Sequence, residues 1–214
     1  MALNKLKFNS LNVTPAASEA IRFNSGANGF ETASAGGSLV KIASSTASSS
    51  ASISFTSGID STYKEYIFFF NNIHPASDTQ KLTFQADTGT NTNYNQVITS
   101  TAFGAYNFEN GSAQQLSYDT NDDLAQSTSF QPLCNTVGND NDQSASGSLH
   151  IFDPSSSVFV KHWISNFCIS HNADLVSTRH NAGYFNTTTA LTRFNFKFES
   201  GNIDAGTIDM YGVK

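Results

Sequence analysis

Histidine offers this chain its most versatile chemistry, because a neutral imidazole binds zinc and titrates near neutral pH. The five histidines form neither an HExxH nor an HxH motif, in which two imidazoles would share one face of an element. Two of them fall in segments that alternate like strands, where a hydrogen-bonded structural imidazole is the common outcome. We therefore predict no zinc site at His74, His150, His162, His171 or His180, of which His150 and His162 are the two in strands.

Two oxygen-rich loops carry side chains of the kind that calcium prefers. One covers residues 138–143 and contains Asp140 and Asp142, and the other is Asn121-Asp122-Asp123. Carboxylate and amide oxygens bind Ca²⁺ in such loops, but the spacing lacks the glycine and the terminal glutamate of an EF-hand. We expect solvated turns, with a calcium site at Asp140 and Asp142 as the alternative and no other cofactor. The stretch 87–91 reads as a hairpin turn.

Catalytic motifs are missing from the sequence. Serine is frequent but no GxSxG elbow is present, and a carboxylate pair for glycoside hydrolysis would have to come from Glu65 or Glu109 and an aspartate. We predict that the chain is not an enzyme. The two cysteines, Cys134 and Cys168, are too few for a disulfide framework and have no metal-site spacing, so we expect two buried thiols.

Four tyrosines lie near polar loops, where an aromatic ring could stack on a sugar. The competing interpretation is that each ring packs at an edge of the fold with its hydroxyl in water. We expect the packing role, and carbohydrate binding remains the alternative. The tyrosines are Tyr94, Tyr106, Tyr118 and Tyr184.

The composition favours an all-β protein. Ser, Thr and Asn are abundant and compete with helical backbone hydrogen bonds, while the 18 phenylalanines supply large buried area on pleated sheets. Charged residues make up only 13% and the net charge is −6, so no basic surface is available to neutralise phosphates and we predict no nucleic-acid binding. No apolar run reaches the length of a signal peptide or a membrane span, so we expect no membrane insertion.

Alternating apolar residues mark the candidate strands. Tyr63–Phe70 predicts a central strand that ends in a turn at Asn71-Asn72, and Ser44–Ser54 is either a linker or the approach to a strand at Ile53 and Phe55. Residues 194–198 and 208–210 predict a closing hairpin. Nine to eleven strands are expected, in a jelly-roll-like antiparallel β-sandwich. The other candidates are Leu82 with Phe84, Val97 with Thr99, Phe103–Phe108, Ser148–Phe152 and Val158–Phe167.

The first 39 residues read as an arm in front of a sandwich domain at 40–214. Thr14 can cap a short helix that Pro15 opens, and four glycines at 26, 29, 36 and 37 stop any continuation. Arms of this kind anchor partners. The candidate contact residues are Thr14, Pro15, Ile21 and Phe23.

Three sequence segments resemble segments of a known class of proteins. They are the segment Thr14–Asn24, the pair His74-Pro75 after Asn72-Ile73, and the ending Ser200–Val213 with its Thr-Ile-Asp-Met-Tyr-Gly-Val close. The chain resembles virion structural proteins of tailed bacteriophages, particularly those of marine and freshwater hosts. The resemblance implies a β-sandwich and a place in the particle, and it implies no catalytic residues.

Together these observations predict a structural component of a phage virion. A tail-associated or fibre protein exposed on the particle and involved in host attachment is the first expectation, and a capsid decoration or cement protein is the alternative. A carbohydrate-binding module is the second alternative. Expected partners are other virion proteins, further copies in a homotrimer and a host-surface glycan. An exterior-type composition without a secretion signal fits assembly in the host cytoplasm and release by lysis.

Overall fold

A computed structural model describes residues 19–34 and 38–214, and the chain divides into two compact units between Leu39 and Val40. The described residues form strands and no helix, which confirms the all-β prediction. The strands are β1 (Glu19–Phe23), β2 (Phe30–Ser34), β3 (Leu39–Thr46), β4 (Ile53–Phe55), β5 (Glu65–Pro75), β6 (Leu82–Thr88), β7 (Ile98–Phe108), β8 (Gln114–Tyr118), β9 (Gln131–Pro132), β10 (Ala145–Phe152), β11 (Lys161–His171), β12 (Leu175–Phe185), β13 (Leu191–Phe198) and β14 (Ile203–Val213).

The first unit contains a β-hairpin, in which β1 pairs antiparallel with β2. The helix expected from Thr14 lies outside the described residues up to position 18, and from Glu19 onward it is wrong, because this stretch is β1. Cross-strand pairing accounts for the strand: Arg22 forms an ion pair of 3.0 Å with Glu31, and Phe23 stacks on Phe30 with ring centroids 4.9 Å apart.

The second unit is a double-sheet jelly roll with additions. The eight strands that form the jelly roll itself are, in chain order, β3, β4, β5, β6, β9, β10, β13 and β14. Four of them give the order β3-β14-β5-β10 in one sheet, and the other four give β4-β13-β6-β9 in the second sheet. Apart from β6 and β9, which pair with each other in the small sheet, successive strands of these eight alternate between the sheets and return beside earlier ones. This is the jelly-roll topology that the sequence predicts.

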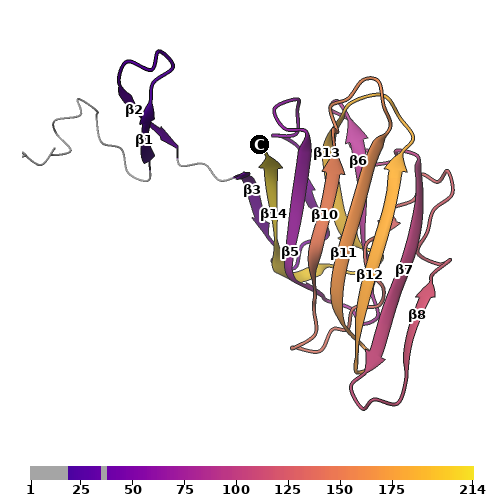
Figure 1. The fold of residues 1–214 in the computed structure, drawn as a ribbon. Helices are drawn as coiled ribbons and strands as arrows, with labels where there is room; N and C mark the ends of the chain where they lie inside the picture. Colours follow the sequence, from indigo (N-terminus) through magenta and orange to yellow (C-terminus); the bar gives the residue numbers. More distant parts are fainter. Residues whose placement is uncertain (1–18, 35–37) are drawn as a thin grey trace, which may run out of the picture. The chain divides into compact units, whose positions relative to one another are not determined.

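Two inserted pairs of strands enlarge one sheet. β7 and β8 lie in the chain between β6 and β9, and β11 and β12 lie between β10 and β13. All four join the first sheet beyond β10, giving β3-β14-β5-β10-β11-β12-β7-β8, as Figure 1 shows from edge to edge. The large sheet thus has twice as many strands as the small one. Of its added half, Trp163 of β11 and Phe185 of β12 still pack against Phe84 of the small sheet.

Phenylalanine fills the space between the sheets. Phe196 of β13 lies at the centre, with its ring centroid 5.1 Å from that of Phe68 and 5.2 Å from that of Phe70. Each fully buried ring stabilises the fold by about 1.5–3 kcal/mol. The phenylalanines with almost no exposed surface are Phe68, Phe70, Phe84, Phe185, Phe194, Phe196 and Phe198.

Two strand boundaries differ from the prediction. β5 does not turn at Asn71-Asn72 but continues to Pro75, because Asn72 adopts a φ of 50° and a bulge absorbs the irregularity. Ser44–Thr46 belong to β3 and are not a linker. The central position of the predicted Tyr63–Phe70 strand is confirmed, since β5 lies between β14 and β10.

The predicted closing hairpin is wrong. β13 pairs with β4 and β6 in the small sheet, whereas β14 pairs with β5 in the large one. Both strands alternate as expected, but alternation does not specify the neighbour. The connection between them crosses from one sheet to the other.

The strand count is also higher than nine to eleven. The second unit holds twelve strands, β3 to β14. Hydrophobic alternation does not reveal β8, whose five residues are all exposed, or the long strand β12, whose inward positions are largely polar.

Candidate functional site

The inward face of β12 changes from apolar to polar along its length. Phe185 is buried against the phenylalanine core, but the inward positions Ser177, Arg179 and Asn181 are buried polar residues. Over the polar positions Arg179 and Asn181, the sheet is covered by residues of the loop segment 119–137, which includes β9. Asp119 and Asp122 of that loop pair with Arg179, and the backbone carbonyl of Leu133 accepts a hydrogen bond from Asn181.

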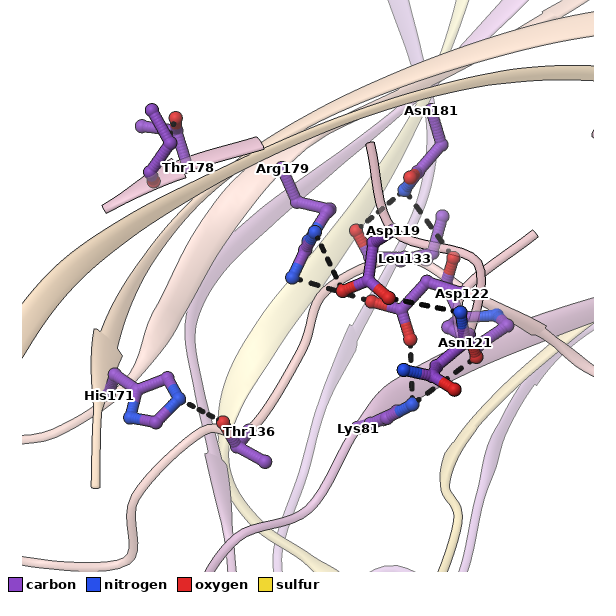
Figure 2. Close-up of polar contacts among 12 residues, drawn as sticks. Lys81, Asp119, Asn121, Asp122, Leu133, Thr136, His171, Thr178, Arg179 and Asn181 are labelled. Carbon is purple, nitrogen blue, oxygen red and sulfur yellow. Dashed lines mark hydrogen bonds and ion pairs between the residues drawn. The ribbon is translucent and has the colours of Figure 1, made fainter. Parts of the chain in front are cut away.

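Arg179 is the centre of a buried charge cluster. One terminal nitrogen of its guanidinium lies 3.1 Å from a carboxylate oxygen of Asp119, and the other lies 3.5 Å from Asp122. The Nζ of Lys81, on the neighbouring β6 side, lies 2.7 Å from the second oxygen of Asp122. Figure 2 shows these four side chains converging beneath the ribbon of the sheet.

The cluster balances two cations with two anions. Asp122 and Arg179 are almost fully buried, and Asp119 and Lys81 keep some solvent contact. Burial would lower the pKa of Lys81, but the hydrogen bond to Asp122 and the nearby carboxylates outweigh burial, so the pKa lies above its ordinary value. A buried cluster of this kind fixes geometry, because removing one member leaves an uncompensated charge.

Amide groups extend the cluster into a polar layer. The side-chain nitrogen of Asn181 donates to the carbonyl of Leu133 at 2.9 Å, and that of Gln131 donates to the carbonyl of Asp122 at 2.7 Å. Gln131 also accepts a hydrogen bond of 2.5 Å from the Ser100 hydroxyl. The loop is therefore held to the sheet by directional contacts in addition to the apolar packing of Leu133 and Val137 in the core.

A pocket of about 260 Å³ opens beside Arg179. Its walls come from the inner side of β7 and β12, from β8 and its following loop, and from the segment that contains Asn135. The lining combines apolar and aromatic residues with polar ones. The lining residues that matter below are Tyr106, Phe108, Asp119, Asn135, His171 and Arg179.

Two buried polar atoms that belong to residues lining this pocket have no hydrogen-bond partner within the part of the chain that the structure describes. They are the Nε of Arg179 and the Oδ1 of Asn135. A buried N–H donor or carbonyl acceptor without a partner costs about 1–3 kcal/mol of desolvation. The wall thus offers one donor and one acceptor that the described protein groups leave unused.

His171 lies on the same wall as a neutral imidazole. Its Nδ1 accepts a hydrogen bond from the backbone N–H of Ala173 at 3.1 Å, so its Nε2 carries the proton and donates to the hydroxyl of Thr136. Burial, followed by the positive charge of Arg179, lowers the pKa of His171. The ring therefore stays uncharged at neutral pH.

The outer face of the added strands has a different character. We define the outer face as the solvent-facing side chains of β11, β12 and β7. None of them is Asp, Glu, Lys or Arg, although the whole chain carries a net charge of −6. The members are His162, Ile164, Asn166, Cys168, Val176, Thr178, His180, Ala182, Tyr184, Thr99, Thr101, Phe103, Ala105 and Asn107.

A shallow hollow of about 340 Å³ lies in this outer face. The small residues Thr101, Ala182 and Gly183 form its floor, and Tyr184, His162 and Ile164 lie around it. Gly183 is required there, because a Cβ would lie 2.7 Å from the indole of Trp163 and 2.6 Å from the carbonyl of Thr99. The hollow is lined mainly by apolar surface and contains no charged group.

The histidines lie apart from one another and have individual partners. His150 lies 2.6 Å from Glu65, His180 lies 2.5 Å from Asn166, and His74 lies 3.5 Å from Asp204. His162 packs against Tyr184 on the outer face. Across residues 19–34 and 38–214, no group of three His, Cys, Asp or Glu side chains is arranged to hold a metal ion.

Asp140 and Asp142, the calcium candidates, lie in a turn. The backbone N–H of Gln143 donates to the carbonyl of Asp140 at 2.8 Å, and the Gln143 side chain accepts from the N–H of Asp140. Asp142 lines a polar surface pocket with His74 and Asp204. In the upstream loop, Asp122 is buried and pairs with Lys81 and Arg179, so the expectation of a solvated turn is wrong at this residue.

The predicted tyrosines separate into different settings. Only Tyr106 lines the pocket beside Arg179, where its hydroxyl donates to Gln115 at 3.1 Å. Tyr118 donates to Asp123 at 2.5 Å, and Tyr184 lies on the outer face. Tyr94 has a φ of 48° and its backbone N–H donates to Asp87.

Of the two cysteines, one departs from the prediction. Cys134 is buried, and burial raises the pKa of its thiol to about 12. Cys168 is exposed, because it lies between the inward residues Phe167 and Ile169 of β11 and must point outward. The expectation of two buried thiols is therefore half wrong.

The remaining predicted residues are placed as follows. Glu65 lies in β5 and pairs with His150, and Glu109 follows β7. In the arm, Ile21 and Phe23 are exposed on β1, whereas Thr14 and Pro15 lie outside the described residues.

Three residues of the buried charge cluster were not predicted from the sequence, namely Lys81, Asp119 and Arg179. Arg179 could have been found only through β12, by noticing that an arginine occupies an inward position between Ser177 and Asn181. Its carboxylate partners come from a loop sixty residues away in the chain, and no local pattern links the two segments.

The described chain also contains no helix that is long and apolar enough to cross a membrane. Comparison with protein-family models, with curated proteins and with solved structures gave no match.

Proposed function

We propose that this chain is a structural component of a bacteriophage particle, and specifically a tail-associated or fibre protein exposed on the virion. The proposal is supported by the composition, which is low in charge and rich in Ser, Thr and Asn. It is also supported by the resemblance of the segments Thr14–Asn24, Asn72–Pro75 and Ser200–Val213 to phage virion proteins. Double-sheet jelly rolls recur in viral shell and lectin domains, which is compatible with the role. The role is structural and involves no catalysis.

The observation that carries the proposal is the outer face. Centres of protein interfaces are depleted of charged residues and enriched in aromatic ones. The outer face has no formal charge across three neighbouring strands and exposes Phe103, Ile164 and Val176. Such a face favours contact with further copies of this chain, with a trimer as the expected state, or with another virion protein.

The arm supports an anchoring role of its own. An isolated two-stranded hairpin is marginally stable in water. The hairpin β1–β2 exposes Ile21, Phe23 and Phe30, and the Phe23–Phe30 stack forms an apolar patch. Burial of this patch against a neighbouring protein would stabilise both the hairpin and the contact.

The location on the particle is tested by labelling purified phage with antibodies against this chain. Labelling of the tail or its fibres supports the proposal. Labelling of the head replaces it with the capsid-decoration alternative, and particles without label overturn the virion role.

The outer face is tested by inserting a charge. Ala182→Glu points into solvent from the floor of the hollow, so the monomer should keep its melting temperature while oligomers fall apart in light scattering. Thr56→Glu, on an exposed loop outside this face, is the matched control and should leave the oligomer intact. An oligomer that tolerates Ala182→Glu would place its interface elsewhere.

A further inference from the structure

We propose that the pocket beside Arg179 binds one pyranose ring of an uncharged sugar. The proposal goes beyond the structural role, because it assigns a ligand to a site on the inner side of β7 and β12. It holds for a tail protein and for a head protein alike.

The hydrogen-bonding groups of the wall define what the ligand must offer. The Nε–H of Arg179 needs an acceptor, and the Oδ1 of Asn135 needs a donor. A hydroxyl group serves as both donor and acceptor. Adjacent hydroxyls on one small ring can therefore satisfy both atoms, which a purely donating or purely accepting ligand does not do.

The charge of the wall selects an uncharged ligand. Arg179 contributes one positive charge and Asp119, 3.1 Å away, contributes one negative charge. His171 is neutral, since its Nδ1 accepts a backbone hydrogen bond. An anionic ligand would meet the Asp119 carboxylate and a cationic ligand would meet the guanidinium, so neither gains from the pocket.

The aromatic lining residues offer a surface for the apolar side of a sugar ring. Tyr106 and Phe108 lie edge to face with their ring centroids 5.8 Å apart. Both line the pocket together with Leu175. A pyranose has one face of C–H groups that packs on such a surface while its hydroxyls reach the polar wall.

The size of the pocket limits the ligand to a single ring. Its volume of about 260 Å³ lies below the ~300 Å³ at which pockets for drug-sized ligands begin. A ligand this small, bound by a few hydrogen bonds and one ring contact, is expected to have a Kd of about 1 mM.

The test is a panel of monosaccharides measured by saturation-transfer NMR on the full chain. The panel contains methyl glycosides of glucose, galactose, mannose, fucose and N-acetylglucosamine, with glucuronate and glucosamine as charged probes. Binding of a neutral member in the millimolar range is expected. Binding of none of the neutral members, or of charged members only, would overturn the proposal.

Variants locate the binding. Tyr106→Leu keeps apolar bulk but removes the aromatic ring, and Asn135→Ala removes the unpaired acceptor; each should weaken the bound sugar about tenfold or more, which is roughly 1.4 kcal/mol. Tyr184→Leu on the outer face is the matched control and should bind as the unmodified chain does. Thermal unfolding verifies that every variant is folded.

The opposite result for these variants would contradict the proposal. Loss of binding in Tyr184→Leu, with Tyr106→Leu and Asn135→Ala unaffected, would place the sugar in the outer hollow and refute the assigned pocket. Failure of the sugar proposal is distinct from failure of the virion role, which particle labelling reads independently.

Discussion

Arg179 of β12 and Asp119 of the loop after β8 form an ion pair of 3.1 Å beneath the widened half of the large sheet. The two residues are sixty positions apart in the chain. Their contact holds the covering loop against this part of the sheet. The same two residues also line the neighbouring pocket, so the ion pair both stabilises this region and shapes the pocket.

Replacement of Arg179 by methionine should destabilise the protein by about 3–5 kcal/mol, because Asp122 would remain buried with one cation fewer. Chemical denaturation with urea measures the change in the free energy of unfolding. Lys64→Met is the control, since the Lys64–Asp153 pair is largely exposed and its loss should have almost no effect. Equal effects of the two replacements would contradict the structural role of the cluster.

Truncation of Phe196 to alanine should cost about 3–5 kcal/mol through the cavity left among Phe55, Phe68, Phe70 and Phe84. Phe159→Ala removes the same atoms from a side chain that is 69% exposed, so it should leave the stability of the fold close to that of the unmodified chain. Thermal and urea unfolding of both variants test the position of the core. A small loss for Phe196→Ala would mean that the sheets do not pack at this point.

The two cysteines should differ sharply in reactivity. Cys168 is exposed and should react with a thiol reagent in the native protein, whereas Cys134 is buried with a pKa raised to about 12 and should react only after unfolding. Mass spectrometry before and after denaturation counts the modified thiols. Labelling of both cysteines under native conditions would show that Cys134 is accessible.

Acidification should lower the free energy of unfolding, because His171 is harder to protonate in the folded protein than in the unfolded chain. Its pKa is lowered in the folded state by burial and by Arg179, so below the ordinary value of 6.5 the unfolded chain binds a proton more readily than the folded chain. The stability is therefore complete above pH 6.5 and decreases as the pH falls through the window below it.

Thermal unfolding between pH 7.5 and 5 tests this prediction by comparing the unmodified chain with His171→Asn. The other titrating groups are shared, so the variant should lose less melting temperature on acidification. Parallel pH profiles for the two proteins would remove His171 as the cause.

Much of the fold follows from local sequence patterns. Alternation along residues 194–198 and 208–210 correctly identifies inward phenylalanines and the inward Ile208 and Met210, because side chains of a strand point to opposite faces in turn. The same alternation explains the core strand β5. It does not reveal β12, because the inward residues of this strand are Ser177, Arg179 and Asn181, whose polarity hides the buried face.

The candidate site was less accessible to sequence reasoning. The sequence points to Tyr106 only as one of four similar tyrosines, and it places Asp122 in a loop that is expected to be a solvated turn. Arg179, Asp119 and Lys81 carry no local motif. Their role becomes visible only through contacts between segments that are tens of residues apart in the chain.

The sequence by itself determined that the chain is all-β, that its core is built from phenylalanine and that it carries little charge, because composition and period-two alternation are local properties of the chain. Only the tertiary structure decided that β13 and β14 belong to different sheets, that two inserted strand pairs widen one sheet and that Arg179 meets Asp119 beside a pocket. The physical reason is that alternation fixes which face a side chain takes, whereas the pairing partner of a strand depends on contacts across the whole fold.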